Sequence, residues 1–91
     1  MTENKLLIGS LSNDLVRVAN LSYRGSRGGA QKFWEQAKRW IVELKNQKNK
    51  TYIEKIISDL EQINFDANNL AQAEKNLMYG VLLANYSLGI D

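Results

Sequence analysis

The chain of 91 residues contains no cysteine, no histidine and no proline. Without cysteine it can form neither a disulfide nor a thiolate metal site. Without histidine it lacks the side chain that most often moves protons near neutral pH, and the usual partner of serine and cysteine nucleophiles. These absences predict a protein that is not an enzyme and that holds no metal or cofactor. The absence of proline leaves long helices unobstructed.

Long apolar runs are missing as well. The longest mostly apolar segment, 77–88, is about 12 residues long, whereas roughly 20 are needed to span a bilayer, and Asn85 and Ser87 interrupt it. The N-terminal residues show no apolar region of the length found in a secretory signal. We therefore expect a cytoplasmic protein without a transmembrane segment.

The composition that remains is that of an ordinary globular protein, with 44% hydrophobic and 24% charged residues. The length suits a single domain over 1–91. Charge is unevenly distributed, because residues 1–50 carry a net charge of +6 and residues 51–91 a net charge of −4. Such asymmetry can mark a partner surface, or it can draw two halves of a bundle together, which is the simpler explanation.

Four segments carry apolar residues at the spacing of three to four that is typical of amphipathic helices. They cover about 3–21, 30–44, 51–63 and 69–86. The second has the clearest stripe, and the last has the widest. The residues expected to face the core are Leu7, Leu11, Leu15, Val18 and Leu21 in the first segment, Ala30, Phe33, Trp34, Ala37, Trp40, Ile41 and Leu44 in the second, Ile53, Ile56, Ile57, Leu60 and Ile63 in the third, and Leu70, Ala73, Leu77, Val81, Ala84 and Leu88 in the last, where Ala71, Met78 and Leu82 widen the stripe.

Polar or glycine-rich breaks at 24–29, 46–50 and 64–69 separate these segments. Connections this short favour antiparallel neighbours. We therefore predict an all-α fold, a small antiparallel four-helix bundle with up-down-up-down topology. Thr51, followed three residues later by Glu54, predicts a capping box at the start of the third helix.

The break at 24–29 reads Arg-Gly-Ser-Arg-Gly-Gly and is the most distinctive local feature. Free backbone N–H groups ahead of a helix, beside two arginines, can bind a phosphate or another anion. A flexible turn with solvated arginines is the simpler interpretation. The candidate anion-binding or partner-binding residues are Arg24, Arg27, Lys32, Lys38 and Arg39.

The second helix also places Trp34 and Trp40 opposite its basic side chains. Such a helix can lie on an anionic membrane surface or stack on single-stranded bases. The tryptophans are in register with the apolar stripe, however, so burial explains them without a ligand.

Acidic residues and tyrosines are the other candidates. Asp59 and Glu61 are two positions apart on a helix, so their carboxylates diverge and do not predict an acid–base pair or a metal site. Tyr52, Tyr79 and Tyr86 can serve a partner surface. The simpler interpretation is that they half-cover the bundle.

The end of the second helix carries the segment Ile41-Val42-Glu43-Leu44-Lys45-Asn46. With the short third helix, the long last helix and the tail 85–91, this plan resembles the immunity proteins of pediocin-like bacteriocins. The resemblance implies a cytosolic antiparallel four-helix bundle whose last helix and tail help determine specificity. It further implies a non-catalytic protein that protects a producer cell by engaging a bacteriocin–receptor complex at the inner membrane face.

Together these observations predict a non-catalytic protein that binds another macromolecule, most readily a protein, with immunity-like protection as its most concrete form. The alternative is a nucleic-acid-binding protein that uses the Gly/Arg segment and the second helix, with an affinity that falls as salt rises. A symmetric homodimer also fits, because short bundles often complete their cores by dimerising.

Overall fold

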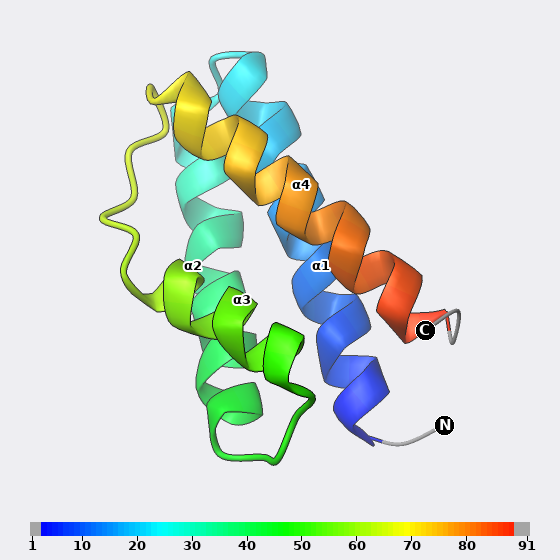
Figure 1. Cartoon of the computed structure of the whole chain (residues 1–91). Coiled ribbons are helices and arrows are strands. Elements are labelled where there is room, and N and C mark those ends of the chain that lie inside the picture. Colours follow the sequence, from blue (N-terminus) through cyan, green and yellow to red (C-terminus); the bar gives the residue numbers. More distant parts are fainter. Residues whose placement is uncertain (1–2, 89–91) are drawn as a thin grey trace.

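A computed structural model describes residues 3–88, and the tail residues 89–91 lie outside the described residues, as do residues 1 and 2 (Figure 1). The described chain forms four helices, α1 (Glu3–Tyr23), α2 (Arg27–Lys45), α3 (Thr51–Glu61) and α4 (Leu70–Ser87). No strand occurs between residues 3 and 88. The predicted all-α four-helix bundle is therefore confirmed. None of the helices in this range is both long and apolar enough to cross a membrane.

Helix α1 is the centre of the bundle, because it packs against α2 on one side and α4 on the other. Both of these neighbours run antiparallel to α1 (Figure 1). Helix α3 is shorter, packs on α2 and crosses it obliquely. The core accordingly lies between α1 and its neighbours and extends beneath α3.

The core side chains of α2 and α3 follow the predicted stripes. Trp34, Ile41 and Leu44 are buried, whereas Phe33 and Trp40 are half-buried at the edge of the core. The predicted core faces of these two helices are confirmed. The largest apolar residues of the core are Ile8, Leu11, Leu15, Val18, Trp34, Ile41, Leu44, Ile53, Ile56, Ile57, Leu60 and Leu83.

Helix α1 ends in a Schellman motif. The N–H of Ser26 donates to the carbonyl of Leu21 (2.9 Å), and the N–H of Gly25 donates to the carbonyl of Ser22 (3.1 Å). Gly25 has a φ of +78°, a conformation that side chains rarely adopt. The chain therefore reverses in a tight turn.

Helix α2 begins directly after this turn, at Arg27, so Gly28 and Gly29 lie in its first helical turn. The sequence pattern had predicted a six-residue flexible break and a helix start at Ala30. A Cβ on Gly29 would lie 3.2 Å from a methyl carbon of Leu21. This glycine therefore permits close packing of α2 on α1, a role that the sequence pattern did not reveal.

The predicted capping box of α3 is wrong. The N-cap residue is Lys50, and no side chain caps this helix; the N–H of Glu54 donates instead to the carbonyl of Lys50 (3.0 Å). Thr51 already lies inside the helix, so its hydroxyl is one position too far along the chain to cap it. Helix α4 has the side-chain cap instead, since Asn69 accepts a hydrogen bond from the N–H of Gln72 (3.1 Å).

The connection 62–69 is held against the bundle by Phe65. Its ring stacks on that of Trp34, with centroids 5.2 Å apart and an interplanar angle of 12°. A stacked aromatic pair adds about 1 kcal/mol beyond the burial of its area. This contact fastens the longest connection of the described chain to α2.

The predicted core face of α4 is wrong for most of its residues, because only Ala73 among the six is buried. The side that packs on α1 carries Ala73, Asn76, Gly80 and Leu83, whereas Leu70, Val81 and Leu88 are exposed. A close approach of the two helices explains this choice of face. A Cβ on Gly80 would lie 2.8 Å from a methyl carbon of Val16 and 3.2 Å from the carbonyl oxygen of Ser12. Small side chains are therefore required where α4 meets α1, and the large ones point outward.

Candidate functional site

The predicted anion-binding residues begin at the turn between α1 and α2. Arg24 lies in the turn and Arg27 opens α2, and both side chains are exposed. The N–H of Arg27 already donates to the carbonyl of Gly25 (3.1 Å), and Ser26 provides no side-chain cap. The turn thus places two arginines beside the N-terminus of α2, where the helix dipole favours negative charge.

The three other predicted residues lie along the exposed side of α2 and do not join this pair in one cluster. Lys38 lies a whole number of turns from Arg27, whereas Lys32 and Arg39 form a second row. Glu35 lies between the two rows and forms an ion pair with Lys38 (2.9 Å). Arg27 and Arg39 are separated by about 18 Å along the helix axis.

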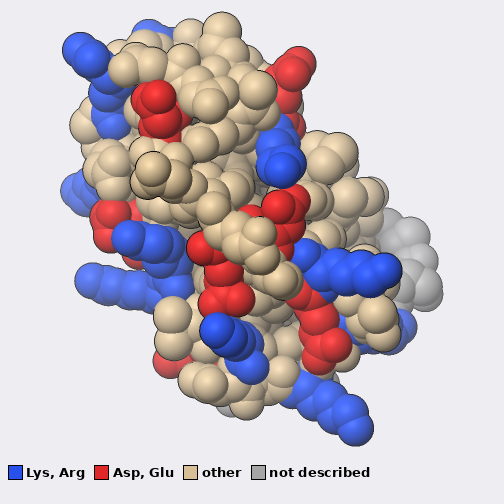
Figure 2. Space-filling view, turned by 60° about the vertical axis from the view of Figure 1, so that its left-hand side comes forward, with Lys and Arg blue, Asp and Glu red and all other residues tan. Residues whose placement is uncertain are grey.

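Acidic side chains also lie among the basic ones in the view of Figure 2. The face shown there therefore carries alternating charges rather than a continuous basic surface. The ion pair between Lys38 and Glu35 does not oppose anion binding at the turn. It does lower the positive electrostatic potential along α2. The hydrogen bond from Lys38 lowers the pKa of Glu35 and keeps this carboxylate charged.

A polar hollow of about 270 Å³ lies between α1 and α2. Within it, Asp14 is only 5% exposed and accepts a hydrogen bond from the indole N–H of Trp40 (2.7 Å). Burial raises the pKa of the Asp14 carboxyl, while the Trp40 hydrogen bond and the charge of Arg17 oppose this rise. Arg17 in turn lies over the ring of Phe33, with its guanidinium carbon 5.3 Å from the ring centroid. These contacts join α1 to α2 and explain why Asp14 is tolerated near the core.

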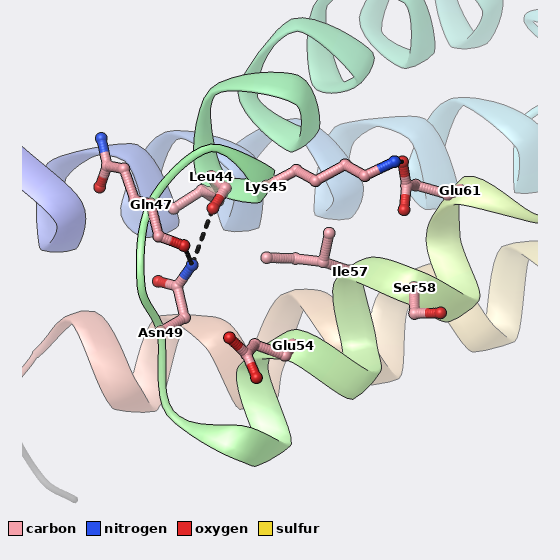
Figure 3. Close-up of a pocket in the computed structure, with 8 residues that line it drawn as sticks. All are labelled: Leu44, Lys45, Gln47, Asn49, Glu54, Ile57, Ser58 and Glu61. Atoms are coloured by element: carbon pink, nitrogen blue, oxygen red, sulfur yellow. Dashed lines mark hydrogen bonds and ion pairs between the residues drawn. The ribbon is translucent and has the colours of Figure 1, made fainter.

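A second hollow of about 290 Å³ lies between the end of α2, the connection 46–50 and α3 (Figure 3). Lys45 reaches across one side of it to Glu61, with 2.9 Å between the charged atoms. Asn49 shapes the opposite wall by donating to the carbonyl of Leu44 (2.8 Å). Glu54 is two helical turns from Glu61, about 10 Å along the axis, so the two carboxylates do not converge.

Within residues 3–88, no group of three or more Asp and Glu side chains is placed to hold a metal ion. Asp59 and Glu61, which the sequence predicts to diverge, indeed have separate partners. Asp59 pairs with Lys75 (3.2 Å), and Glu61 pairs with Lys45. Asp59 and Glu61 thus serve contacts between α3 and its neighbours.

Tyr79 connects α4 to α3, because its hydroxyl donates a hydrogen bond to the carboxylate of Asp59. This bond lowers the pKa of Asp59 and raises the pKa of Tyr79 to about 12. Tyr52 and Tyr86 also bring the two helices together, in an edge-to-face contact with centroids 5.9 Å apart. The tyrosines that the sequence offered as partner contacts are thus engaged within the bundle.

The outer side of α4, away from α1, is covered by no other helix of the described chain (Figure 1). Four of its large apolar side chains are exposed, as is that of the C-cap residue Leu88, with Leu70 at 56%, Val81 at 50% and Leu88 at 73%. We call this surface the α4 stripe. It consists of Leu70, Ala71, Glu74, Leu77, Met78, Val81, Leu82, Asn85 and Leu88.

The α4 stripe borders a shallow hollow of about 420 Å³ that Tyr23 of α1 shares with Leu77, Met78 and Leu82. Glu74 is the one charged residue of the stripe. The side of α4 that holds most of its large apolar side chains therefore faces outward, and its inward side contains the buried Asn76 and Gly80.

Sequence reasoning missed the α4 stripe because it assigned the apolar residues of the stripe to the core. The signal was present in the width of the pattern. Apolar residues cover more of the surface of the last helix than one neighbouring helix can bury. Asn76 and Gly80 interrupt the apolar residues on one side of this helix. A helix with two candidate apolar faces in a small bundle predicts that one of them is left without an intramolecular partner.

No known family model, curated protein or solved structure matches this chain.

Proposed function

We propose that this protein acts without catalysis, by binding another protein through the α4 stripe. The observation that carries the proposal is a row of exposed, mostly apolar side chains on a helix whose opposite side is already packed. Globular monomers rarely expose apolar patches of more than a few hundred Å² unless the patch serves an interaction. Met78 and the neighbouring Tyr23 are of residue types enriched at protein interfaces.

The resemblance to bacteriocin immunity proteins gives this proposal its most concrete form. It assigns specificity to the last helix and the tail, and the α4 stripe lies on the last helix. In that form, the stripe contacts a toxin–receptor complex and so protects the producing cell.

The test is site-specific photocrosslinking in the native cell. A photoreactive residue in place of Val81 should capture a defined protein, whereas the same residue in place of Val42, which is 57% exposed on α2, should not. Adding Leu82→Glu should reduce capture from position 81 at least about tenfold, because the charge must be desolvated on binding. Equal capture from both positions would contradict the proposal.

Nucleic-acid binding is the second candidate, favoured by the exposed Arg24 and Arg27 at the N-terminus of α2. If it holds, binding to single-stranded nucleic acid at low salt should weaken steeply as salt rises. It should also be lost in Arg24→Glu/Arg27→Glu and retained in Val81→Glu. The absence of binding at low salt would remove this candidate.

A further inference from the structure

We infer that the α4 stripe binds a second copy of this chain, with α4 packed antiparallel against α4 of the other copy about a two-fold axis. The inference rests on the proposed function, since it names the partner of the same surface. It is carried by three properties of the stripe: the spacing of its residues, the position of its one charge and its area.

The spacing is that of a helix–helix seam. Ala71, Glu74, Met78, Val81, Asn85 and Leu88 alternate steps of three and four, the pattern that keeps one line of side chains facing a partner helix. An axis that passes between Tyr79 and Gly80 brings Met78 opposite Val81 of the second copy. It also brings Ala71 opposite Leu88 of the second copy. The seam is thus complementary to itself, as a two-fold interface requires.

The position of Glu74 selects the antiparallel arrangement. In this register Glu74 lies opposite Asn85 of the second copy, whose amide can donate a hydrogen bond to the carboxylate. The two Glu74 side chains are then about 16 Å apart along the axis. A parallel pairing would instead place Glu74 against Glu74 in an apolar contact, which like-charge repulsion opposes.

The exposed apolar area is of the size that a dimer needs. The large side chains of the stripe are about half-exposed, and the surface continues onto α1 through Tyr23 at one end and Leu6 at the other. A standard interface buries about 800 Å² on each side, and the stripe with these two residues supplies seven exposed large apolar side chains to such a surface. The antiparallel arrangement brings the Tyr23 end of one copy to the Leu6 end of the other. Both of these α1 residues therefore contribute to the interface.

The first experiment measures the mass of the purified full chain by sedimentation or light scattering, from low to high micromolar concentration. The expected result is a dimer that dissociates on dilution. Val81→Glu should weaken the dimer at least about a hundredfold, because the two-fold axis introduces the charge twice at the centre of the seam. Val42→Glu places the same charge on an equally exposed valine of α2 and should leave the dimer intact.

The helical content of each variant, measured by circular dichroism, controls for folding. If Val81→Glu fails to fold, Val81→Ser provides the same test with a smaller expected effect. A chain that stays monomeric at high micromolar concentration overturns the inference. A dimer that tolerates the Val81 substitutions overturns it as well.

The second experiment determines whether the two α4 helices run parallel or antiparallel. The chain has no native cysteine, so only the introduced cysteines can form disulfides. Single variants Met78→Cys and Val81→Cys are mixed under mild oxidation. The antiparallel register predicts that the mixed disulfide between positions 78 and 81 forms fastest, because a disulfide requires Cα atoms within about 7 Å. Faster formation of the 78–78 and 81–81 disulfides would indicate parallel helices and overturn the inference.

The two proposals fail in distinguishable ways. A monomeric chain whose position 81 still crosslinks to a different protein overturns the second-copy inference and leaves the proposed function standing. A monomeric chain that also captures nothing from position 81 removes both.

Discussion

At the scale of single residues, Asn76 is the most unusual member of the interface between α1 and α4. It is fully buried, and neither its amide nitrogen nor its amide oxygen has a hydrogen-bond partner. A buried polar group without a partner costs about 1–3 kcal/mol of stability. Asn76 therefore weakens the attachment of α4 while occupying space that a leucine of the same branched shape would fill.

Asn76→Leu should raise the free energy of unfolding by about 1–2 kcal/mol, because it removes the unpaired amide and buries apolar carbon instead. Urea denaturation measures the change. Asn20→Leu, at an exposed position of α1, makes the same substitution in a helix and should change stability by less than about 0.5 kcal/mol. A loss of stability in Asn76→Leu would contradict this prediction.

Replacing two of the glycines with alanine should change the stability of the protein in opposite directions. Gly80→Ala should destabilise the protein by about 1–3 kcal/mol, since the added Cβ would lie 2.8 Å from Val16 and overpack the α1–α4 contact. Gly28→Ala should stabilise it by about 0.5 kcal/mol, because nothing lies within 4 Å of the added Cβ and alanine is the better helix former.

Thermal unfolding of both glycine variants provides the measurement. If Gly80→Ala is as stable as the unsubstituted chain, α1 and α4 are further apart than the structure places them. The hydrogen bond from the hydroxyl of Ser12 to the carbonyl of Gly80 (2.6 Å) depends on the same close approach.

At the scale of helices, the polar contacts of α4 with α3 centre on Asp59, whereas α4 packs on α1 mainly through small and apolar side chains. The hydroxyl of Tyr79 and the ammonium of Lys75 both engage Asp59. Because the bond to Asp59 raises the pKa of Tyr79 to about 12, the folded protein holds this proton more tightly than the unfolded chain does. The bond therefore contributes stability that is complete below pH 10 and is lost as the pH rises towards 12.

Tyr79→Phe should lower the free energy of unfolding by about 1 kcal/mol near neutral pH, the usual net contribution of one hydrogen bond. The difference between the two proteins should vanish as the pH rises from about 10 to about 12, since the tyrosine ionises there. Urea denaturation across this range tests both statements. A difference that persists unchanged to the alkaline end would contradict the assigned bond.

The helices differ in how well sequence alone predicted their buried faces. In α2 and α3 the large apolar residues occupy one side, so residues such as Trp34, Ile41 and Ile57 had only one plausible orientation. In α4 they occupy more than one side, and the choice depends on the shape of α1 around Ser12 and Val16. A one-dimensional pattern carries no information about that shape.

The same limit explains what could be predicted of the candidate sites. The five basic residues were expected at the surface because lysine and arginine are rarely buried, and all five are exposed. Anion binding by them stays a prediction. The sequence could not predict which side of α4 faces outward. The α4 stripe is exposed because Gly80 and Asn76, on the opposite side of the helix, pack against α1.

At the scale of the whole molecule, α1 has helices packed on two sides while α3 packs chiefly on α2. Opening of the structure should therefore begin at α3 and the connection 62–69. Amide protons near Leu11, Leu15 and Val18 should exchange at the slowest rates, and those of α3 at least about tenfold faster. Native-state hydrogen exchange followed by NMR measures these rates.

Two results would contradict this prediction. Uniform protection across all four helices would mean that the molecule opens as one unit. Slower exchange in α3 than in α1 would place the stable centre elsewhere. Phe65→Ala should increase the exchange rates of α3 and the 62–69 connection more than those of α1, because it removes the stacking contact with Trp34.

The pairing of the first helix with the last has a consequence for synthesis. While the ribosome extends the chain, the side of α1 that receives α4 has no neighbouring helix. Ser12 and Val16 therefore remain exposed to solvent until α4 has left the exit tunnel. Contacts between such distant parts of a chain form late and slow the search for the native state. Completion of this core therefore waits for α4, and a nascent chain that stalls before α4 offers an unfinished surface to chaperones and proteases.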